Sequence, residues 1–176
     1  YEPHPFRLSS ICQEHSFSVR IFFRNTHIMP RVRKMKDNKD VLSSVLKTTQ
    51  MGQLGIRSAL DCDMKPELRK AVESQLREYD AIESEAHSIA RKRNWQVSEL
   101  NPSIRFMTDR MARMQLSFGD VNSKLAAMMI RGNTSGIIMG LKNLHQLEKP
   151  DDAVYALSQK LLDTESNNVH QMKRFL

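Results

Sequence analysis

Two glutamates and two histidines are the residues whose types and spacing are best suited to chemistry in this sequence. Glu83 is followed by His87 four residues later, and Glu165 is followed by His170 five residues later. Both glutamates fall on or beside the apolar stripe of a predicted helix, where a carboxylate is costly unless paired, hydrogen-bonded, protonated or metal-bound. Inward carboxylates on facing helices hold di-iron centres in helical bundles. These four residues are therefore the candidate metal ligands, with iron or manganese as the candidate ion.

A second interpretation explains the same glutamates without a metal. Glu83 would then reach the bundle edge and pair with a Lys or Arg. Glu165 would join a polar core layer and hydrogen-bond one of three residues, Thr49, Gln53 or Asn133. These three residues occupy places where the first and third helices of a metal-binding bundle would supply acids, and the Glu-x-x-His spacing is also absent. We therefore favour this interpretation and expect no resident cofactor, with the metal site as the alternative.

Four long helices must position these residues. Their starts are marked by capping residues and by helix-starting prolines: Asp37 or Asn38, Pro66, Asp120 and Pro150. The expected helices cover about 38–60, 66–93, 120–148 and 150–173, with a short connecting helix at about 103–116. Because all four are amphipathic and short links join them in pairs, the sequence predicts an all-α four-helix bundle over 35–176.

The core-facing residues follow from placing each helix at 100° steps. Each of the four helices then has one apolar stripe that contains a few polar residues. The stripes are Leu42, Val45, Leu46, Thr49, Gln53, Ile56 and Leu60; Leu68, Val72, Leu76, Tyr79, Ile82, Ala86 and Ala90; Ala126, Met129, Ile130, Asn133, Ile137, Leu141 and Leu144; and Val154, Leu161, Leu162, Val169 and Met172.

The distribution of charge argues against two classes of partner. The formal net charge is +7, but residues 1–34 hold six basic and only two acidic residues, so the remainder carries +3. In that remainder the cations are mostly interleaved with acids, whereas a nucleic-acid interface needs a clustered basic face. No stretch approaches the roughly 20 apolar residues of a membrane span. We therefore expect no nucleic acid and no membrane span, and a cytoplasmic protein.

Residues 1–34 differ in composition from the rest. They hold four of the seven Phe and three of the six Pro but none of the six Gly, and they show no helical period. We expect a disordered tail or a non-native upstream extension, with Met35 as the native start; the alternative is a flexible docking arm. Deleting them should move the thermal midpoint by only a few degrees, because no core area would be lost. A loss above about ten degrees would show that they are packed.

Two smaller patterns concern helix packing and symmetry. Gly132, Gly136 and Gly140 recur at one-turn spacing on a predicted helix, which favours close helix packing over a phosphate loop. Gly55–Leu60 is similar to Gly140–His145 at an offset of 85 residues. The second pattern predicts two related helical hairpins joined by a long crossover at 94–119. We also expect Trp95 to cap the end of the bundle, partly buried, rather than to bind a ligand.

Four segments of the first half of the chain resemble a known superfamily. They are Val45-Leu-Lys-Thr-Thr-Gln-Met-Gly, Pro66-Glu-Leu-Arg-Lys, Gln75-Leu-Arg-Glu-Tyr-Asp and Arg93-Asn-Trp-Gln. Together they resemble the ferritin-like superfamily, and within it the spore-coat F-like proteins and small relatives of spore-forming bacteria. The resemblance covers roughly residues 40–100. It implies a ferritin-like bundle from a bacterium, possible iron chemistry, and an association with spores.

The departures from this family bear on its chemistry. Gln50 stands about where the family has a glutamate on the first helix, and Asn94 stands where it has a glycine in the turn. Glu78 matches a family acid in the second helix but falls off the buried stripe. The resemblance therefore implies the fold more strongly than it implies metal chemistry.

Two functions follow from the sequence. The favoured one is a non-catalytic bundle, similar to spore-coat F-like proteins, that acts by self-association as a homo-oligomer or by binding a protein partner. The alternative is a ferritin-like metal-binding protein or oxidoreductase that uses Glu83, His87, Glu165 and His170. We favour the first and therefore expect no enzymatic activity.

Overall fold

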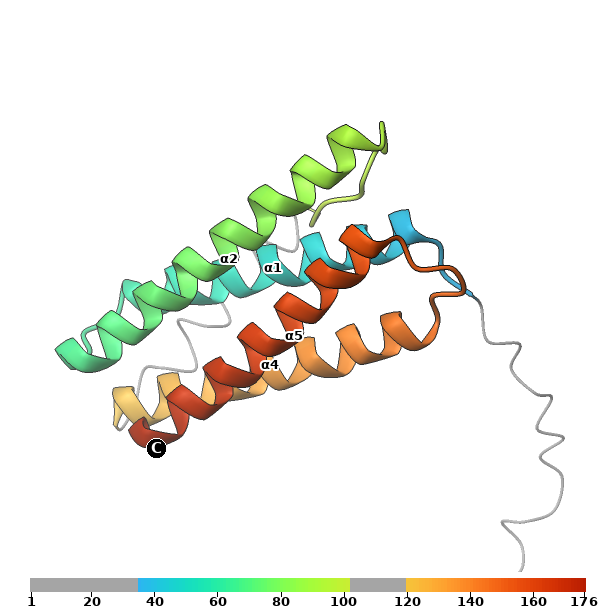
Figure 1. Ribbon diagram of the computed structural model, residues 1–176. Coiled ribbons are helices and arrows are strands. Elements are labelled where there is room, and N and C mark those ends of the chain that lie inside the picture. Colours follow the sequence, from blue (N-terminus) through green and yellow to red (C-terminus); the bar gives the residue numbers. More distant parts are fainter. Residues whose placement is uncertain (1–34, 102–119) are drawn as a thin grey trace, which may run out of the picture. The chain divides into compact units, whose positions relative to one another are not determined.

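The computed structural model describes residues 35–101 and 120–176, and every long element in these ranges is a helix. The helices are α1 (Asn38–Leu60), α2 (Pro66–Lys92), α4 (Val121–His145) and α5 (Asp152–Met172), and a 3-10 turn (Lys173–Phe175) follows α5 (Figure 1). The expected all-α four-helix bundle is confirmed. The expected tail at 1–34 and the short helix at 103–116 lie outside the described residues.

The helices begin where the capping residues predict. Asp37 accepts a hydrogen bond from the backbone N–H of Asp40, and Asp120 and Asp151 cap α4 and α5 in the same way. Each cap satisfies a backbone donor that the first turn leaves without a helical acceptor. Helix α4 ends at His145, a few residues earlier than predicted. Beyond it, the Gln146 carbonyl accepts from the Lys36 N–H.

The end of α2 is a tight turn built around Asn94. Its φ of 54° is left-handed, a conformation in which asparagine substitutes for glycine at low cost. The N–H of Trp95 reaches the carbonyl of Ala90 at 2.9 Å, which closes a Schellman motif. Trp95 is partly buried and packs against the hydrophobic core, so its expected capping position is confirmed.

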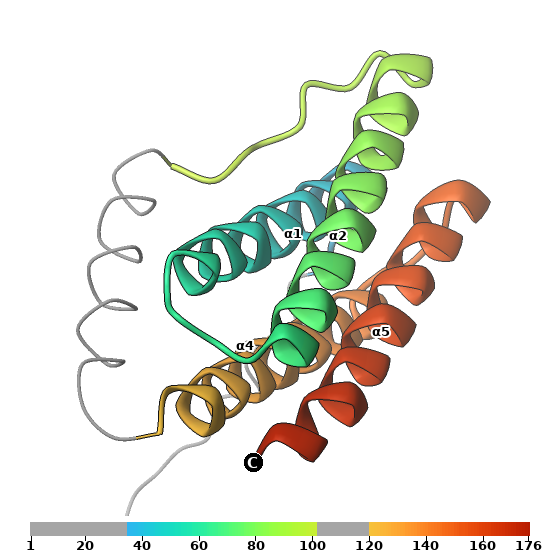
Figure 2. The same cartoon turned by 90° about the vertical axis from the view of Figure 1, so that its left-hand side faces the viewer.

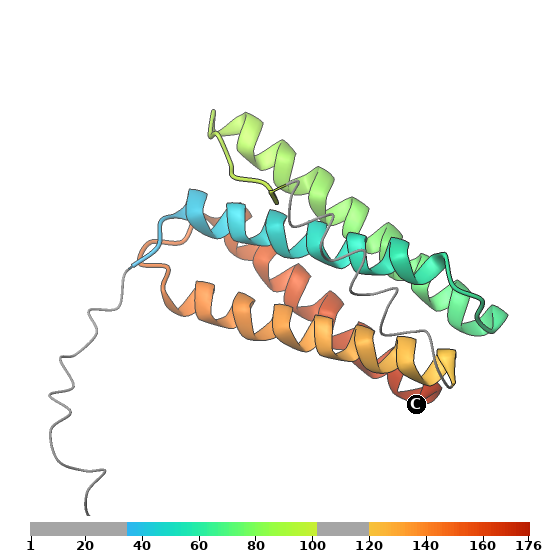
Figure 3. The same ribbon diagram turned by 180° about the vertical axis from the view of Figure 1, so that it is seen from behind.

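The four helices form two antiparallel hairpins, α1 with α2 and α4 with α5 (Figure 2). Helix α1 also packs on α4, and α2 packs on α5. Contacts at the helix ends fix the directions: the Lys65 N–H meets Asn122 at the start of α4, and Arg93 meets Asp151 at the start of α5. Helices α2 and α4 therefore run the same way. The chain leaves α2 at one end of the bundle and enters α4 at the other, as the predicted crossover requires (Figure 3).

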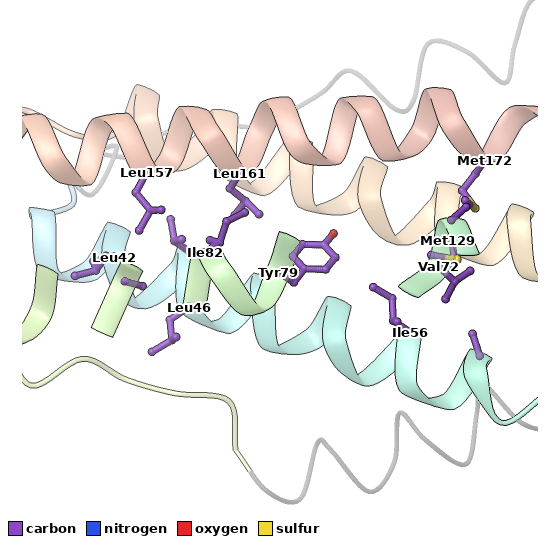
Figure 4. Packing of buried hydrophobic residues seen from close by; sticks show 14 of the residues in the cluster. Leu42, Leu46, Ile56, Val72, Tyr79, Ile82, Met129, Leu157, Leu161 and Met172 are labelled. Carbon is purple, nitrogen blue, oxygen red and sulfur yellow. The ribbon is translucent and has the colours of Figure 1, made fainter. Parts of the chain in front are cut away.

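Large apolar side chains fill the space between the helices. Leu42, Leu68, Ile82 and Leu157 are almost completely buried, and Figure 4 shows such residues meeting along the bundle axis. The predicted stripes of α1, α2 and α5 are buried or half-buried throughout. Removing such area from water is the main stabilising contribution to a bundle of this kind.

The predicted stripe of α4 is wrong at Leu141, whereas Ile137 and Leu144 are half-buried as expected. Leu141 was expected to face the core, but it is 45% exposed. The buried positions there are held by Gly136 and Asn143, so hydrophobicity alone misplaces the face. A Cβ atom at Gly140 would lie 2.7 Å from Leu162, and one at Gly136 would overlap the Glu165 carboxyl group. Close packing through these two glycines is therefore confirmed, whereas a Cβ atom at Gly132 would meet no residue of 35–101 or 120–176 within 4 Å.

Candidate functional site

Glu165 lies in the middle of the bundle and is only 1% exposed. It projects from α5 towards α4, where Gly136 leaves room for its carboxyl group. Its Oε1 lies 3.5 Å from the hydroxyl of Tyr79 on α2. Glu165 therefore belongs to a polar core layer, as the favoured interpretation expects, although its partner is Tyr79 rather than Thr49, Gln53 or Asn133.

This core layer consists of Tyr79, Asn133, Glu165 and Asn168. The Tyr79 hydroxyl donates to Asn133 Oδ1 at 2.9 Å, and Asn168 Nδ2 donates to the same oxygen at 3.3 Å. The Asn133 amide in turn donates to the Met129 carbonyl within α4. Three helices are thereby joined by side-chain hydrogen bonds deep in the bundle, which fixes their register.

The charge of Glu165 is controlled by burial. Desolvation raises the pKa of its carboxyl group to about 8, and the Tyr79 hydrogen bond opposes this only in part. Burial, together with the proximity of Glu165, also raises the pKa of Tyr79. Glu165 is therefore protonated near neutral pH. Its Oε2 atom is buried and has no hydrogen-bond partner among the described residues.

Glu83 lies in a different environment, at the edge between α1 and α2. Its two carboxylate oxygens accept hydrogen bonds from Gln50 Nε2 at 2.9 Å and Gln53 Nε2 at 2.7 Å. The prediction that Glu83 reaches the edge is confirmed, and glutamine amides are among the groups that bind it there. Gln50 also accepts from the Leu100 N–H at 2.8 Å, so it ties the segment after α2 to α1.

The two histidines complete the set of sequence candidates. His87 Nε2 lies 3.9 Å from Glu83 Oε1 and 3.8 Å from Glu99 Oε1, so it belongs to the same edge. We call Gln50, Gln53, Glu83 and His87 the edge cluster. His170 is exposed on α5. The four predicted ligands are thus divided between the edge cluster, the core layer and the surface.

These residues do not fit the metal centre that the alternative function requires. Within 35–101 and 120–176, no three His, Cys, Asp or Glu side chains form a group that could hold a metal ion. Both oxygens of Glu83 face amide N–H groups, which are donors and not ligands. Iron and manganese prefer several carboxylate or imidazole ligands around one point. We therefore derive no chemistry through either ion.

A cavity of about 590 Å³ lies between α1 and α4 and ends at the core layer. Its floor includes Tyr79, Asn133 and Glu165. Its apolar walls include Met51, Ile56, Leu100, Met128 and Met139. An apolar cavity that ends on a few polar groups has the usual composition of a small-molecule site. Sequence analysis missed it, although the glycines of α1 and α4 are the signal that marks it.

The outer face of α4 is a second surface feature, and it includes Leu141, which the sequence had placed in the core. We define it as Arg131, Thr134, Ile138, Leu141 and Lys142, which are all exposed. Ile138 is 49% exposed and Leu141 is 45% exposed, and Met139 beside them is 47% exposed. Helix α4 contains no Asp or Glu, so this face is apolar at its centre and cationic at its margins.

Comparison with known proteins does not assign this bundle to a family. No protein-family model matches the chain, and neither does any curated protein or solved structure. None of the helices in the described ranges is long and apolar enough to cross a membrane. The functional argument therefore depends on the core layer, the edge cluster, the cavity and the outer face of α4.

Proposed function

We propose that this chain is a non-catalytic helical-bundle protein that binds another protein through the outer face of α4. The observation that carries this proposal is the exposure of Ile138 and Leu141, each nearly half accessible on the outer face of α4. Scattered apolar side chains are normal on a surface, but a group on one face favours a binding site. Burying one such side chain in an interface contributes about 1.5–3 kcal/mol.

The charge on this face favours one kind of partner. Arg131 and Lys142 flank the apolar centre, and α4 has no acid to neutralise them. In an antiparallel pairing of two copies about Ile138, the cationic ends of the two faces would meet each other. An apolar partner segment flanked by acidic residues complements the face instead. We therefore assign a different protein, rather than a second copy, as the occupant.

The polar groups of the bundle support a non-catalytic role. The core layer holds one carboxyl group whose neighbours are a phenol and two amides. The edge cluster holds a carboxylate already bound by two amides. The core layer fixes the register of the helices, and the edge cluster attaches the segment after α2 to α1. Neither arrangement pairs a nucleophile with a base. The single crossover between hairpins is typical of ferritin-like folds, which supports our proposal of a ferritin-like origin. From the sequence resemblance alone we also propose a spore-associated or cytoplasmic location.

Two synthetic peptides test the proposed occupant. Both are amphipathic helices with the same leucine stripe, and they differ only in having glutamate or lysine flanks. We expect the acidic peptide to bind the full chain at least about tenfold more tightly, measured by calorimetry at moderate salt. Ile138→Lys should weaken that binding by about tenfold or more. Equal binding of the two peptides would contradict the proposal.

A matched control and a second measurement sharpen this test. Tyr155 on α5 is exposed to the same extent as Leu141, at 45%. Tyr155→Lys therefore controls for adding a cation at an exposed apolar position, and it should leave peptide binding unchanged. Sedimentation of the chain alone should show no dimer that Ile138→Lys disrupts. Such a dimer would identify a second copy as the occupant and overturn the assignment.

A further inference from the structure

The cavity between α1 and α4 exists because glycines replace side chains along both helices. A Cβ atom at Gly55 or Gly132 would meet no described residue within 4 Å, so within the described part of the chain each glycine opens onto free space. Glycine costs roughly 0.5–1 kcal/mol relative to alanine inside a helix. The chain therefore carries two helix-weakening residues whose common effect is to widen one cavity.

The glycine at the floor of the cavity has a different effect. Any Cβ at Gly136 would overlap the Glu165 carboxyl group. Gly136 thus lets a carboxyl group from α5 reach the surface of α4, beside the Tyr79 hydroxyl and Asn133. Together these residues place a polar floor below walls of methionine, leucine and isoleucine.

One polar atom of this floor has no partner. Glu165 is 1% exposed, and its Oε2 atom makes no hydrogen bond with any described residue. Leaving a buried polar atom unpaired costs about 1–3 kcal/mol. Tyr79 does not relieve this cost, because its hydroxyl approaches the other oxygen, Oε1, at 3.5 Å. A buried group of this kind, lining an apolar cavity, is suited to a hydrogen bond with a ligand.

We propose that this cavity binds a neutral, mainly apolar small molecule that presents a hydrogen-bond acceptor to the carboxyl group of Glu165. A volume of about 590 Å³ falls within the range of ordinary small-molecule sites. Methionines supply adaptable walls, since Met51, Met128, Met129 and Met139 all line it. This site is separate from the proposed protein-binding residues Ile138 and Leu141, which do not line the cavity.

The charges around the cavity select a neutral ligand. Among the described residues, the floor holds Glu165, Tyr79 and Asn133 but no cation, so an anionic head group would be buried there without a counter-charge. Lys47 is the cation among the described lining residues, and it is itself exposed. An ammonium head group would require an ionised Glu165 and the desolvation of both charges. A carbonyl oxygen requires neither, because a protonated carboxyl group donates directly.

Three probes with the same ten-carbon chain test the class of ligand. They are 2-decanone, decanoate and decylammonium, each used below its micelle concentration with the full chain. The readout is the NMR spectrum of methyl-labelled methionine, in which Met51 and Met129 report on the cavity. Met64 and Met172 are buried in the core without lining the cavity, so they are the internal controls.

The expected result is a selective response to the ketone. It should shift the Met51 and Met129 signals while leaving Met64 and Met172 unchanged, and bind at least about tenfold more tightly than either charged probe. Tighter binding of decanoate or decylammonium would overturn the assignment of a neutral ligand. No shift at either cavity methionine would overturn the site itself.

Variants distinguish a specific binding site from unspecific hydrophobic binding. Gly132→Leu fills the empty cavity without a Cβ clash and should abolish ketone binding in a folded protein, while Gly132→Ala should reduce it less. Glu165→Leu should weaken ketone binding by about tenfold, because the donor is lost. Glu165→Gln keeps an N–H donor and should stay within about threefold of the wild type. Undiminished binding by Glu165→Leu would show an unspecific apolar cavity and overturn the proposal.

Discussion

Glu83 and Glu165 are the same residue type in two regions of one bundle, and their surroundings differ in hydrogen-bond donors and in water. In the edge cluster, Glu83 is partly exposed and accepts from two glutamine amides. In the core layer, Glu165 is buried, has Tyr79 3.5 Å away, and keeps one oxygen without a partner. The difference shows that the hydrogen-bond donors and the water around a glutamate on a helical stripe decide how strongly its carboxyl group is perturbed.

The largest effect should come from closing the space for the core carboxyl group. Gly136→Ala places a Cβ onto the Glu165 carboxyl group, which must move within a filled core. We expect a loss of about 2–3 kcal/mol in the free energy of unfolding, measured by urea titration. Gly55→Ala is the matched control, because its Cβ meets none of the described residues within 4 Å. It should stabilise the protein by up to about 1 kcal/mol. An equal loss of stability in both variants would show that the space at Gly136 is not specifically needed by the Glu165 carboxyl group.

A smaller effect should follow from removing the hydroxyl that joins the helices of the core layer. Tyr79→Phe leaves Asn133 without its closest donor and Glu165 without its hydroxyl neighbour. The expected loss is about 1–2 kcal/mol in thermal or urea unfolding. Tyr155→Phe is the control at an exposed tyrosine and should change stability little. An equal change in stability for Tyr79→Phe and Tyr155→Phe would show that the hydrogen bonds of the core layer contribute nothing specific to stability.

The smallest effect belongs to the edge cluster. Glu83→Gln keeps the shape of the side chain but replaces a charged acceptor of two amide hydrogen bonds with a neutral one. We expect a loss of about 0.5–1 kcal/mol near pH 7, since the site is partly solvated. Glu165→Gln, the same substitution in the core layer, should produce no loss of stability near pH 7. Stabilisation by Glu83→Gln would mean that the two glutamates do not differ as described.

The sequence predicted more of the fold than of the site. The faces of α1, α2 and α5 follow their large apolar residues, and the place of Glu165 on its stripe was enough to put it in the core. Helix α4 was misread at Leu141 because Gly136 and Asn143 hold its buried positions, so this exposed leucine could not be told from a core residue.

The partners of the two glutamates were beyond sequence reasoning for a related reason. Whether Tyr79 or Thr49 meets Glu165 depends on the register between helices that are distant in the chain. Thr49 instead bonds to the Val45 carbonyl of its own helix. The cavity forms because glycines of α1 and glycines of α4 line the same space. Predicting the buried face of each helix separately does not reveal which residues of two helices meet.

The central claim is that Glu165 is a neutral acid in the folded protein near pH 7. Its pKa of about 8 in the folded state lies above the ordinary value of 4.5, so the folded state holds a proton that the unfolded state has released. Stability should therefore fall as pH rises between these two values, by several kcal/mol in total, and level off above them. Glu165→Gln removes this dependence without removing the shape of the side chain.

The most direct measurement is the unfolding free energy of the wild type and of Glu165→Gln at about pH 5 and about pH 8.5, by urea titration. At the lower pH we expect the two proteins to agree within about 1 kcal/mol, because the carboxyl group is neutral in the folded state. At the higher pH we expect Glu165→Gln to be more stable than the wild type by at least about 2 kcal/mol. The same difference at both pH values would contradict the account, because Glu165 would then keep one charge state throughout.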